Sequence, residues 1–355
     1  MRRPLLCLAA TLLMVWVGFQ LSADEPRAAQ AIVQEASIAE PAMKPPVIRK
    51  SKKRERLGQV STKHLPYPVF GIDEVLDQLT KVGAKLHKAG KTKGDVELRK
   101  QLDRKTCELT LPAATDAPVS DRELYLRACE SVFIVCSLYK GEGRDDWQTS
   151  LATAFVVNED GVLSTSCHVF DNEDTADAIV VMDVKKNVYP VTELLAANKL
   201  TDTCLFRIDV KNLKPLPLAE DAVPGANVRV VAHPGDSFYY FSSGHVANYE
   251  RDSDSVLWMN ITADFGQGSS GGPVFNEQGH VIGQVSRTYT LYAGGSETRG
   301  RQHRVAGDTK SVDKNLTEVK AAPEEFMDPQ MVFKSCVPVQ SLHALTKVKP
   351  VPKAD

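Results

Sequence analysis

A serine between glycines is the feature of this sequence with the clearest chemical use. It lies in the segment GQGSSGGPVF, which contains Gly268, Ser270 and Gly271. Glycines let the backbone turn sharply and bring amide N–H groups to one point, where they can bind a developing oxyanion. A Gly/Ser segment alone is also typical of a plain loop between two strands. The segment therefore predicts either such a loop or an oxyanion-binding site next to a nucleophilic serine.

Two residues with acid–base side chains precede this serine, each at the end of a strand-like segment. His168 follows an apolar run in VLSTSCHVF, and Asp202 opens the segment TDTCLFRID. A single histidine after a strand is more often a packing residue. In the order His168, Asp202, Ser270, however, the three residues resemble the trypsin-like serine proteases, and more narrowly their bacterial HtrA/Deg-type branch.

The resemblance extends from about Ser120 to Leu345 and depends on several segments in the same order, which together are more specific than any one motif. They are AFVVNEDGVLSTSCHVF, TDTCLFRID, PGANVRVVAHPG, SSGHVANYERD, GQGSSGGPVFNEQGHVIGQVS and VFKSCVPV. The resemblance implies an all-β fold of two six-stranded antiparallel β-barrels with the active site between them.

The same resemblance assigns a catalytic role to each residue. Ser270 would be the nucleophile, and His168 would remove its proton and later protonate the leaving amine. Asp202 would fix the imidazole tautomer and stabilise the imidazolium. The N–H groups of Gly268 and Ser270 would bind the oxyanion. Asp183 and Asp209 also border apolar segments, but only Asp202 opens a strand at the family position.

Four residues are candidates for substrate binding. Asp264 stands six positions before Ser270, where enzymes that cleave after Arg or Lys carry an acid. Phe265 is large enough to fill a pocket, and Arg287, which follows Ser286, could neutralise Asp264 internally. The HtrA-type branch prefers small aliphatic residues instead. Cleavage after basic residues and cleavage after small apolar residues therefore both remain open.

The sequence departs from the family pattern at several positions. Ser269 replaces the aspartate that binds a freshly cut N-terminus in chymotrypsin-like zymogens. Cys167 and Cys204 stand where small apolar residues are usual, and His233 stands where the branch carries asparagine. No PDZ module is expected after Leu345, which questions the regulated caging typical of the branch.

The elements that must position these residues are mostly short strands. Ser120-x-x-Glu123 predicts the start of a helix. The strand-like segments that follow, separated by Gly-containing turns, predict an all-β barrel or sandwich. They are Ser131–Tyr139, Thr153–Asn158, Val162–Ser164, Ala178–Asp183, Thr203–Ile208, Val228–Ala232, Ser255–Ile261, Val274–Phe275, His280–Arg287 and Met331–Val339. Within the expected protease domain, residues 119–347, the polar stretch 292–329 reads as an exposed insertion.

The N-terminal part of the chain divides into three segments. Residues 1–23 have the pattern of a secretory signal peptide, with an uncleaved membrane anchor as the alternative. Residues 24–70 read as a disordered basic linker whose run Arg49–Arg56 is either a solvated tether or an attachment to anionic polymers. Residues 71–118 form a helical extension, since apolar residues from Ile72 to Leu86 fall at helical spacing. That helix should dock on the main domain or on a partner. Residues 348–355 are a tail.

Composition excludes several classes of protein. Of 355 residues, 43% are hydrophobic and 25% charged, with a net charge of −2, which excludes a multi-span membrane chain and gives no support for nucleic-acid binding. No cysteine pair has metal-site spacing, so neither a metal nor a cofactor is expected. Cys167 and Cys204 should be neighbours, either as buried thiols or as a disulfide, whereas Cys129 and Cys136 should not pair with each other.

The leading hypothesis is an exported serine endopeptidase, periplasmic or secreted, that acts on proteins or peptides. One alternative is a catalytically silent homologue that binds a peptide or a partner. Another is a membrane-anchored scaffold in which the helix near Ile72 matters more than the protease. Membrane association would come through the N-terminus. The sequence leaves the oligomeric state open.

Overall fold

The computed structural model describes residues 65–114, 116–140, 146–171, 175–220, 222–292 and 329–348. The expected signal peptide, most of the basic linker, the interior of the 292–329 insertion and nearly all of the tail lie outside these ranges. Within them, no helix is both long enough and apolar enough to cross a membrane.

The first half of the expected protease domain forms a closed antiparallel barrel. Its six strands are β2 (Val132–Lys140), β3 (Trp147–Asn158), β4 (Val162–Thr165), β5 (Ala178–Met182), β6 (Val188–Asn198) and β7 (Thr203–Ile208). They pair in the order β2-β3-β4-β7-β6-β5. Phe133, Val156, Phe170 and Phe206 are fully or almost fully buried in its core, where the Phe170 and Phe206 rings meet edge to face.

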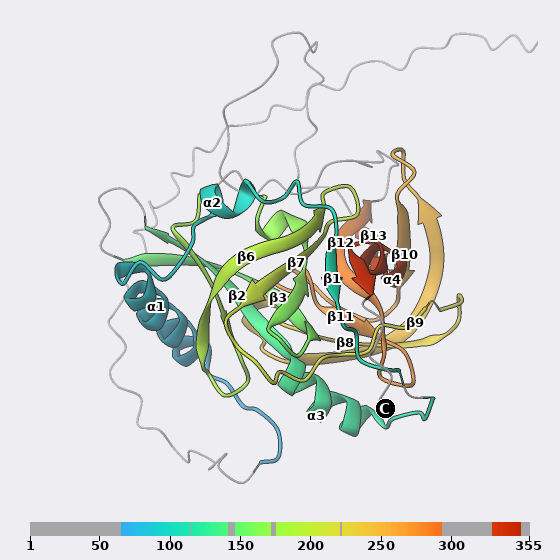
Figure 1. The fold of residues 1–355 in the computed structure, drawn as a ribbon. Coiled ribbons are helices and arrows are strands. Elements are labelled where there is room, and N and C mark those ends of the chain that lie inside the picture. Colours follow the sequence, from blue (N-terminus) through green and yellow to red (C-terminus); the bar gives the residue numbers. More distant parts are fainter. Residues whose placement is uncertain are drawn as a thin grey trace, which may run out of the picture. The chain divides into compact units, whose positions relative to one another are not determined.

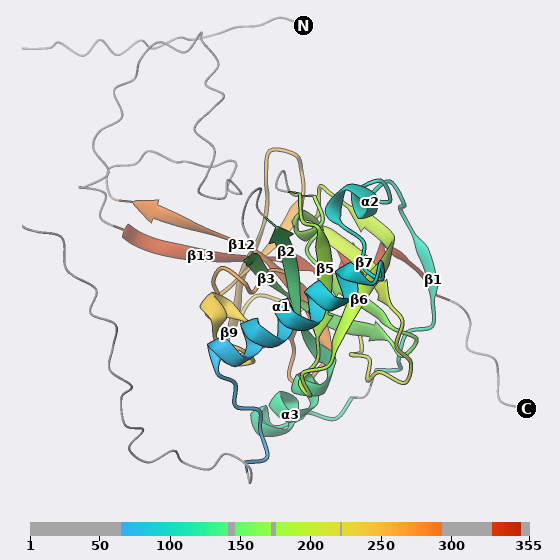
Figure 2. The same cartoon turned by 90° about the vertical axis from the view of Figure 1, so that its left-hand side faces the viewer.

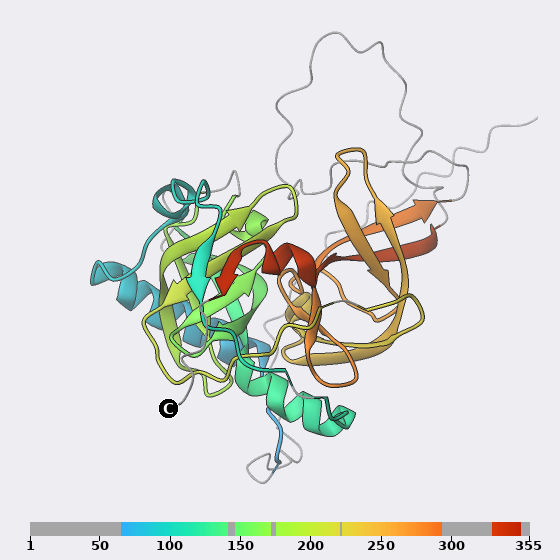
Figure 3. The same ribbon diagram turned by 45° about the vertical axis from the view of Figure 1, so that its right-hand side comes forward.

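A second closed barrel follows it. Its strands are β8 (Asn227–Ala232), β9 (Tyr240–Arg251), β10 (Leu257–Ile261), β11 (Pro273–Phe275), β12 (Val281–Tyr292) and β13 (Pro329–Pro338), in the order β10-β13-β12-β11-β8-β9. The two barrels lie side by side, the first in green and yellow and the second mainly in gold and orange (Figure 1, Figure 3). The expected fold of two six-stranded antiparallel barrels is confirmed.

Two barrel strands, β6 and β9, have no counterpart among the apolar segments of the sequence, and in β9 a single residue is fully buried. β6 contains Pro190, Thr192 and Glu193, and most of its residues are only half-buried. Such a strand lacks a continuous apolar run because one of its faces meets solvent. Its neighbours β5 and β7 nevertheless hold it in the barrel through paired backbones.

Helices cover the outside of the barrels. α1 (Ile72–Lys88), which the apolar spacing predicted, lies across the first barrel (Figure 2). Its buried Val75 and Leu79 pack in one cluster with Leu138 of β2 and Val180 of β5. The expectation that this helix docks on the main domain is therefore confirmed.

Three shorter α-helices are also present among the described residues. α2 (Asp95–Arg99) follows α1, and α4 (Val339–His343) follows β13. α3 (Asp121–Ser131) begins as predicted, because the Ser120 side chain accepts a hydrogen bond from the Glu123 N–H. This bond satisfies one of the free donors of the first helical turn.

The segment expected to be a helical extension also contains a strand. β1 (Cys107–Leu109) pairs in parallel with β14 (Thr346–Val348), which follows α4. Three residues are too few to show a strand period in the sequence. The pairing ties this segment to the C-terminal end of the barrel domain.

Candidate active site

His168 and Asp202 are held together at the end of the first barrel. His168 lies in the short helix η1 (Cys167–Val169) just after β4, and Asp202 lies just before β7. The Nδ1 atom of His168 is 2.9 Å from Asp202 Oδ2, and the His168 N–H donates to Oδ1 at 3.0 Å. The Asp202 carbonyl also accepts from the Cys167 N–H at 3.2 Å. Asp202 itself adopts a left-handed φ of 50°, a strained conformation that aspartate tolerates better than most residues.

This pair shifts the protonation of both side chains. Burial lowers the pKa of His168, but the negative charge of Asp202 and the hydrogen bond to it outweigh that effect, so the pKa lies above its usual value. Burial works to raise the pKa of Asp202, yet the charge of His168 and its hydrogen bonds hold that pKa below the usual value. The pair therefore favours an ionised carboxylate beside a readily protonated imidazole.

Ser286 connects this pair to Ser270. Its hydroxyl donates to Asp202 Oδ2 at 2.6 Å, and its carbonyl accepts from the Ser270 hydroxyl at 3.4 Å. The neighbouring Gln284 donates to the Asp202 carbonyl at 3.4 Å. The structure thus brings His168, Asp202 and Ser270 into one hydrogen-bonded group. Sequence reasoning placed Ser286 at the substrate; its contact with Asp202 was not foreseen.

The loop before Ser270 presents two backbone N–H groups, those of Gly268 and Ser270, that could bind one oxyanion. A trans peptide directs its carbonyl and its N–H to opposite sides. The Gln267 carbonyl is taken by the Gly235 N–H at 2.8 Å, and the Ser269 carbonyl by the Gly272 N–H at 2.9 Å. The N–H groups of Gly268 and Ser270 therefore point away from these partners, and no described residue accepts from either. These are the two donors expected of an oxyanion hole.

Gly268 occupies a position that only glycine fits. Its φ is +92°, and a Cβ atom there would lie 2.4 Å from the His233 carbonyl oxygen. His233 is itself fully buried, and its Nδ1 accepts from the Tyr239 N–H at 3.0 Å. Burial lowers the pKa of His233 to about 3, so it stays neutral and serves as a packing residue behind the loop.

Thr153 of β3 joins the nucleophile loop to the first barrel. Its N–H donates to the Ser270 carbonyl at 2.9 Å, and its hydroxyl donates to the Gly268 carbonyl at 2.9 Å. The same hydroxyl oxygen accepts from the His233 N–H at 3.2 Å. Sequence reasoning missed Thr153, because an ordinary strand threonine carries no local signal of such a contact.

The family model described as "Trypsin-like peptidase domain" matches residues 152–283, a range that holds His168, Asp202 and Ser270. Over these residues the chain is similar to trypsin-like peptidase domains. The apolar segments predicted an all-β barrel or sandwich, the family resemblance implied two six-stranded barrels, and the structure has two such barrels.

Named relatives match the same region. "Probable periplasmic serine endoprotease DegP-like" from Halomonas elongata is 28% identical over 158 residues, covering 43% of this chain and 32% of the relative. The protein of the same name from Marinomonas sp. is 30% identical over 152 residues, covering 41% of this chain and 32% of the relative. The match thus spans about a third of these relatives' length. Among solved structures, the serine endoprotease from Yersinia pestis aligns with a TM-score of 0.40 and 21% identity, over 49% of this chain and 60% of the other.

The sequence allowed an internal ion pair between Asp264 and Arg287, two of the four residues predicted to bind substrate, and the structure does not contain that pair. The Asp264 side chain is 80% exposed, and its nearest cation is Lys334, 3.8 Å away. Arg287 instead lies 3.9 Å from Asp252, with its guanidinium 3.6 Å from the centre of the Trp258 ring. The suggestion that Arg287 neutralises a buried Asp264 is therefore wrong.

Phe265, by contrast, is 4% exposed and packs in the core of the second barrel. The large side chain next to Asp264 thus fills the interior of the second barrel, whereas the sequence analysis had assigned it to the substrate pocket. The structure brings Ser286 to Asp202 and Ser270, Phe265 to the core and Arg287 to Trp258. Only Asp264 stands largely in solvent.

All six described cysteines are free thiols. The disulfide between Cys167 and Cys204 is thus wrong, and the alternative of two buried thiols holds. Burial raises the pKa of the Cys167 thiol to about 12, which removes its nucleophilic thiolate at neutral pH. Cys129 and Cys136 are likewise unpaired, as expected.

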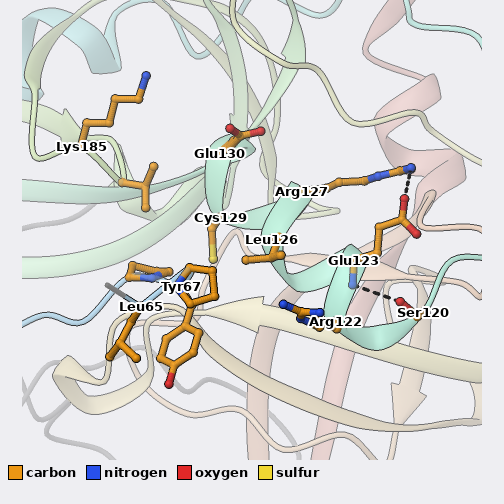
Figure 4. A pocket seen from close by; sticks show the side chains of 13 residues that line it. Leu65, Tyr67, Ser120, Arg122, Glu123, Leu126, Arg127, Cys129, Glu130 and Lys185 are labelled. Atoms are coloured by element: carbon orange, nitrogen blue, oxygen red, sulfur yellow. Dashed lines mark hydrogen bonds and ion pairs between the residues drawn. The ribbon is translucent and has the colours of Figure 1, made fainter. Parts of the chain in front are cut away.

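A surface pocket of about 770 Å³ lies away from these residues, between residues 65–68 and α3. Figure 4 shows Leu65 and Tyr67 on one side and Leu126 and Cys129 on the other. None of His168, Asp202, Ser270 and Ser286 lines it. The chemistry described above therefore belongs to the barrel junction rather than to this pocket.

Proposed function

We propose that this protein is an exported serine endopeptidase in which Ser270, His168 and Asp202 act as a catalytic triad. The observation that carries the proposal is the hydrogen-bonded group His168–Asp202–Ser286–Ser270. Beside this serine, the N–H groups of Gly268 and Ser270 have no acceptor among the described residues. The family match supports the reaction class, because trypsin-like peptidases hydrolyse peptide bonds through a nucleophilic serine.

The reaction follows from the positions of the donors and acceptors. Because the Nδ1 atom of His168 faces the Asp202 carboxylate, its proton resides there, and Nε2 is left as the base. On substrate binding, the Ser270 hydroxyl turns from the Ser286 carbonyl towards Nε2 and attacks the scissile carbonyl carbon. The proton passes to His168, and the carbonyl oxygen becomes an oxyanion held by the N–H groups of Gly268 and Ser270.

Two further proton transfers complete the cycle. His168 gives its proton to the leaving amine, which departs with the C-terminal half of the substrate and leaves an acyl group on Ser270. Water then attacks this ester, with His168 as its base, and releases the N-terminal half as an acid. Asp202 stays ionised throughout and stabilises the imidazolium each time it forms.

Export is proposed on two grounds. The first 23 residues have the composition of a signal peptide, and the relatives quoted above are named as periplasmic. The mass of the mature N-terminus in an exporting bacterial host tests the cleavage site. A chain that keeps Met1 and stays in the cytoplasm would contradict export.

Labelling of the active serine tests the reaction. A fluorophosphonate probe should label the full chain, and labelling should disappear in Ser270→Ala and fall sharply in His168→Ala. A denatured sample serves as the background, and a labelled peptide library should be cleaved with the same pattern of losses. Absence of labelling in the folded wild type would favour the catalytically silent homologue instead.

A further inference from the structure

A lysine ammonium lies beside the nucleophile loop. Lys334 of β13 is paired with Ile261 of β10 on one side and with Thr288 of β12 on the other. Thr288 is the second residue after Ser286, which accepts the Ser270 hydroxyl. From there the Lys334 ammonium donates to the Phe265 carbonyl and lies 5.4 Å from the centre of the Phe265 ring.

The free edge of β12 shows where a substrate would lie relative to this charge. β11 pairs with β12 only as far as Gln284, and the Gly271 and Gly272 backbones pair with Val285. Beyond Ser286, no described strand pairs with that edge of β12. An extended substrate whose carbonyl lies at Ser270 can add its backbone there as a further strand.

The side chain that precedes the scissile bond then falls between the free β12 edge and the start of the nucleophile loop. Lys334 spans these two segments, because it pairs with Thr288 on one and bonds to Phe265 on the other. The ammonium therefore lies in the wall that this substrate side chain would meet.

The charge of Lys334 is only weakly compensated. Its side chain is 17% exposed, whereas that of Asp264 is 80% exposed and 3.8 Å away, beyond hydrogen-bond distance. Among the described residues, the Phe265 carbonyl is the hydrogen-bond acceptor of the ammonium, which has three N–H donors. A shielded cation with unused donors favours an anion and disfavours a second cation.

We propose that Lys334 makes this protease select an acidic residue, Glu or Asp, immediately before the scissile bond. The proposal rests on the serine endopeptidase function proposed above. This proposal replaces the two alternatives left open by the sequence, cleavage after basic residues and cleavage after small apolar residues. Asp264 lies mostly in water, and Lys334 repels the basic side chain that Asp264 would attract.

Cleavage of matched peptides tests the selection. Three fluorogenic peptides that differ only in this residue, Glu, Gln or Lys, are compared at low salt and pH 7.5, where Glu is ionised. For the wild type, kcat/KM should be about tenfold or more higher for the Glu peptide than for the Gln peptide, and lowest for the Lys peptide. The attraction between two partly desolvated opposite charges is strong enough to change kcat/KM by more than tenfold. The Glu/Gln ratio should fall as ionic strength rises.

Variants of the lysine assign the effect. Lys334→Met should bring the Glu/Gln ratio close to one, and Lys334→Arg should retain it. Lys211→Met, which removes an exposed lysine elsewhere, is the matched control and should keep the wild-type ratio. Because the readout is a ratio within one variant, a general loss of folded protein does not alter it. An unchanged ratio in Lys334→Met overturns the proposal.

A binding experiment separates this proposal from the proposed catalysis. Ser270→Ala is titrated into dye-labelled peptides that carry Glu, Gln or Lys at the same position, and fluorescence anisotropy gives each Kd. Tighter binding of the Glu peptide, lost in Ser270→Ala with Lys334→Met, supports the role of Lys334 even if the wild type proves inactive. Equal binding of the Glu and Gln peptides, or no binding of any, overturns it whatever the wild type cleaves.

Discussion

At the scale of single residues, the ionisation of His168 should set the pH dependence of the proposed reaction. A pKa of His168 above its usual value of about 6.5 leaves more imidazolium at neutral pH, and imidazolium cannot accept the Ser270 proton. kcat/KM should therefore rise with pH, with a midpoint above 6.5. In Asp202→Asn the raising effect of the carboxylate is lost while burial remains, so the midpoint should move to lower pH and the rate should fall by about 10⁴-fold.

The pH profile of peptide cleavage measures both effects. His87→Gln changes an exposed histidine on α1 and should leave the profile unaltered. A wild-type midpoint at or below 6.5, or an Asp202→Asn profile with an unchanged midpoint, would show that Asp202 does not control the charge of His168.

At the scale of the element, the nucleophile loop depends on a glycine conformation. Gly268→Ala would place a Cβ atom 2.4 Å from the His233 carbonyl at a φ of +92°. The loop must shift to relieve that clash and so displaces one of the two N–H donors. kcat should fall by about 10²- to 10³-fold, the cost of losing one oxyanion donor, with KM little changed.

Gly225 provides a matched control for this loop. Its φ is +90°, yet a Cβ atom there would meet nothing within 4 Å. Gly225→Ala should therefore lower the free energy of unfolding by about 1 kcal/mol, the cost of a left-handed alanine, as measured by a thermal melt. Its kcat should stay at the wild-type value. Equal losses of kcat in the two variants would mean that the effect of Gly268 is not local.

The docking of α1 is a second property at the element scale. Leu79 is fully buried against the first barrel, whereas Ile72 on the same helix is 50% exposed. Leu79→Ala should lower the free energy of unfolding by about 2–5 kcal/mol, because it leaves a cavity under the helix. Ile72→Ala should cost less than about 1 kcal/mol. Urea unfolding compares the two, and equal costs would indicate that α1 does not stay docked in solution.

At the scale of the whole molecule, the proposed active site lies where the two barrels meet. The first barrel supplies His168 and Asp202, and the second supplies Ser270 and Ser286. Thr153 of the first barrel holds two carbonyls of the nucleophile loop, at Gly268 and Ser270. The proposed catalytic geometry therefore depends on contacts between the barrels as much as on either barrel alone.

Removal of the Thr153 hydroxyl tests this dependence. Thr153→Val leaves the Gly268 carbonyl and the His233 N–H without their partner, so unfolding should become easier by about 1–3 kcal/mol. As a positioning residue, Thr153 should also affect kcat by about 10²-fold with KM nearly constant. Thr153→Ser keeps the hydroxyl and should restore kcat. Lost stability with an unchanged kcat would make Thr153 a merely structural residue.

The sequence by itself determined the fold and the three central residues. Short apolar segments separated by turns predicted an all-β barrel or sandwich, because burial on one side of a strand leaves a local pattern. The resemblance of the motifs to a known family added that there are two barrels. The motifs around His168, Asp202 and Ser270 were recognisable because each is contiguous in the chain. The Ser120 cap and the amphipathic period of α1 were readable for the same reason, since both depend on residues within a few positions of each other.

The tertiary structure alone decided which side chains surround those three residues. Thr153 meets Ser270 across 117 positions of sequence, and Lys334 meets Phe265 across 69, so no local pattern could announce either contact. The register shift between Val285 and Arg287 in β12 also mattered, because an extra residue reverses the face on which later side chains lie. Arg287 consequently stacks on Trp258, and the charge beside the nucleophile loop is that of Lys334.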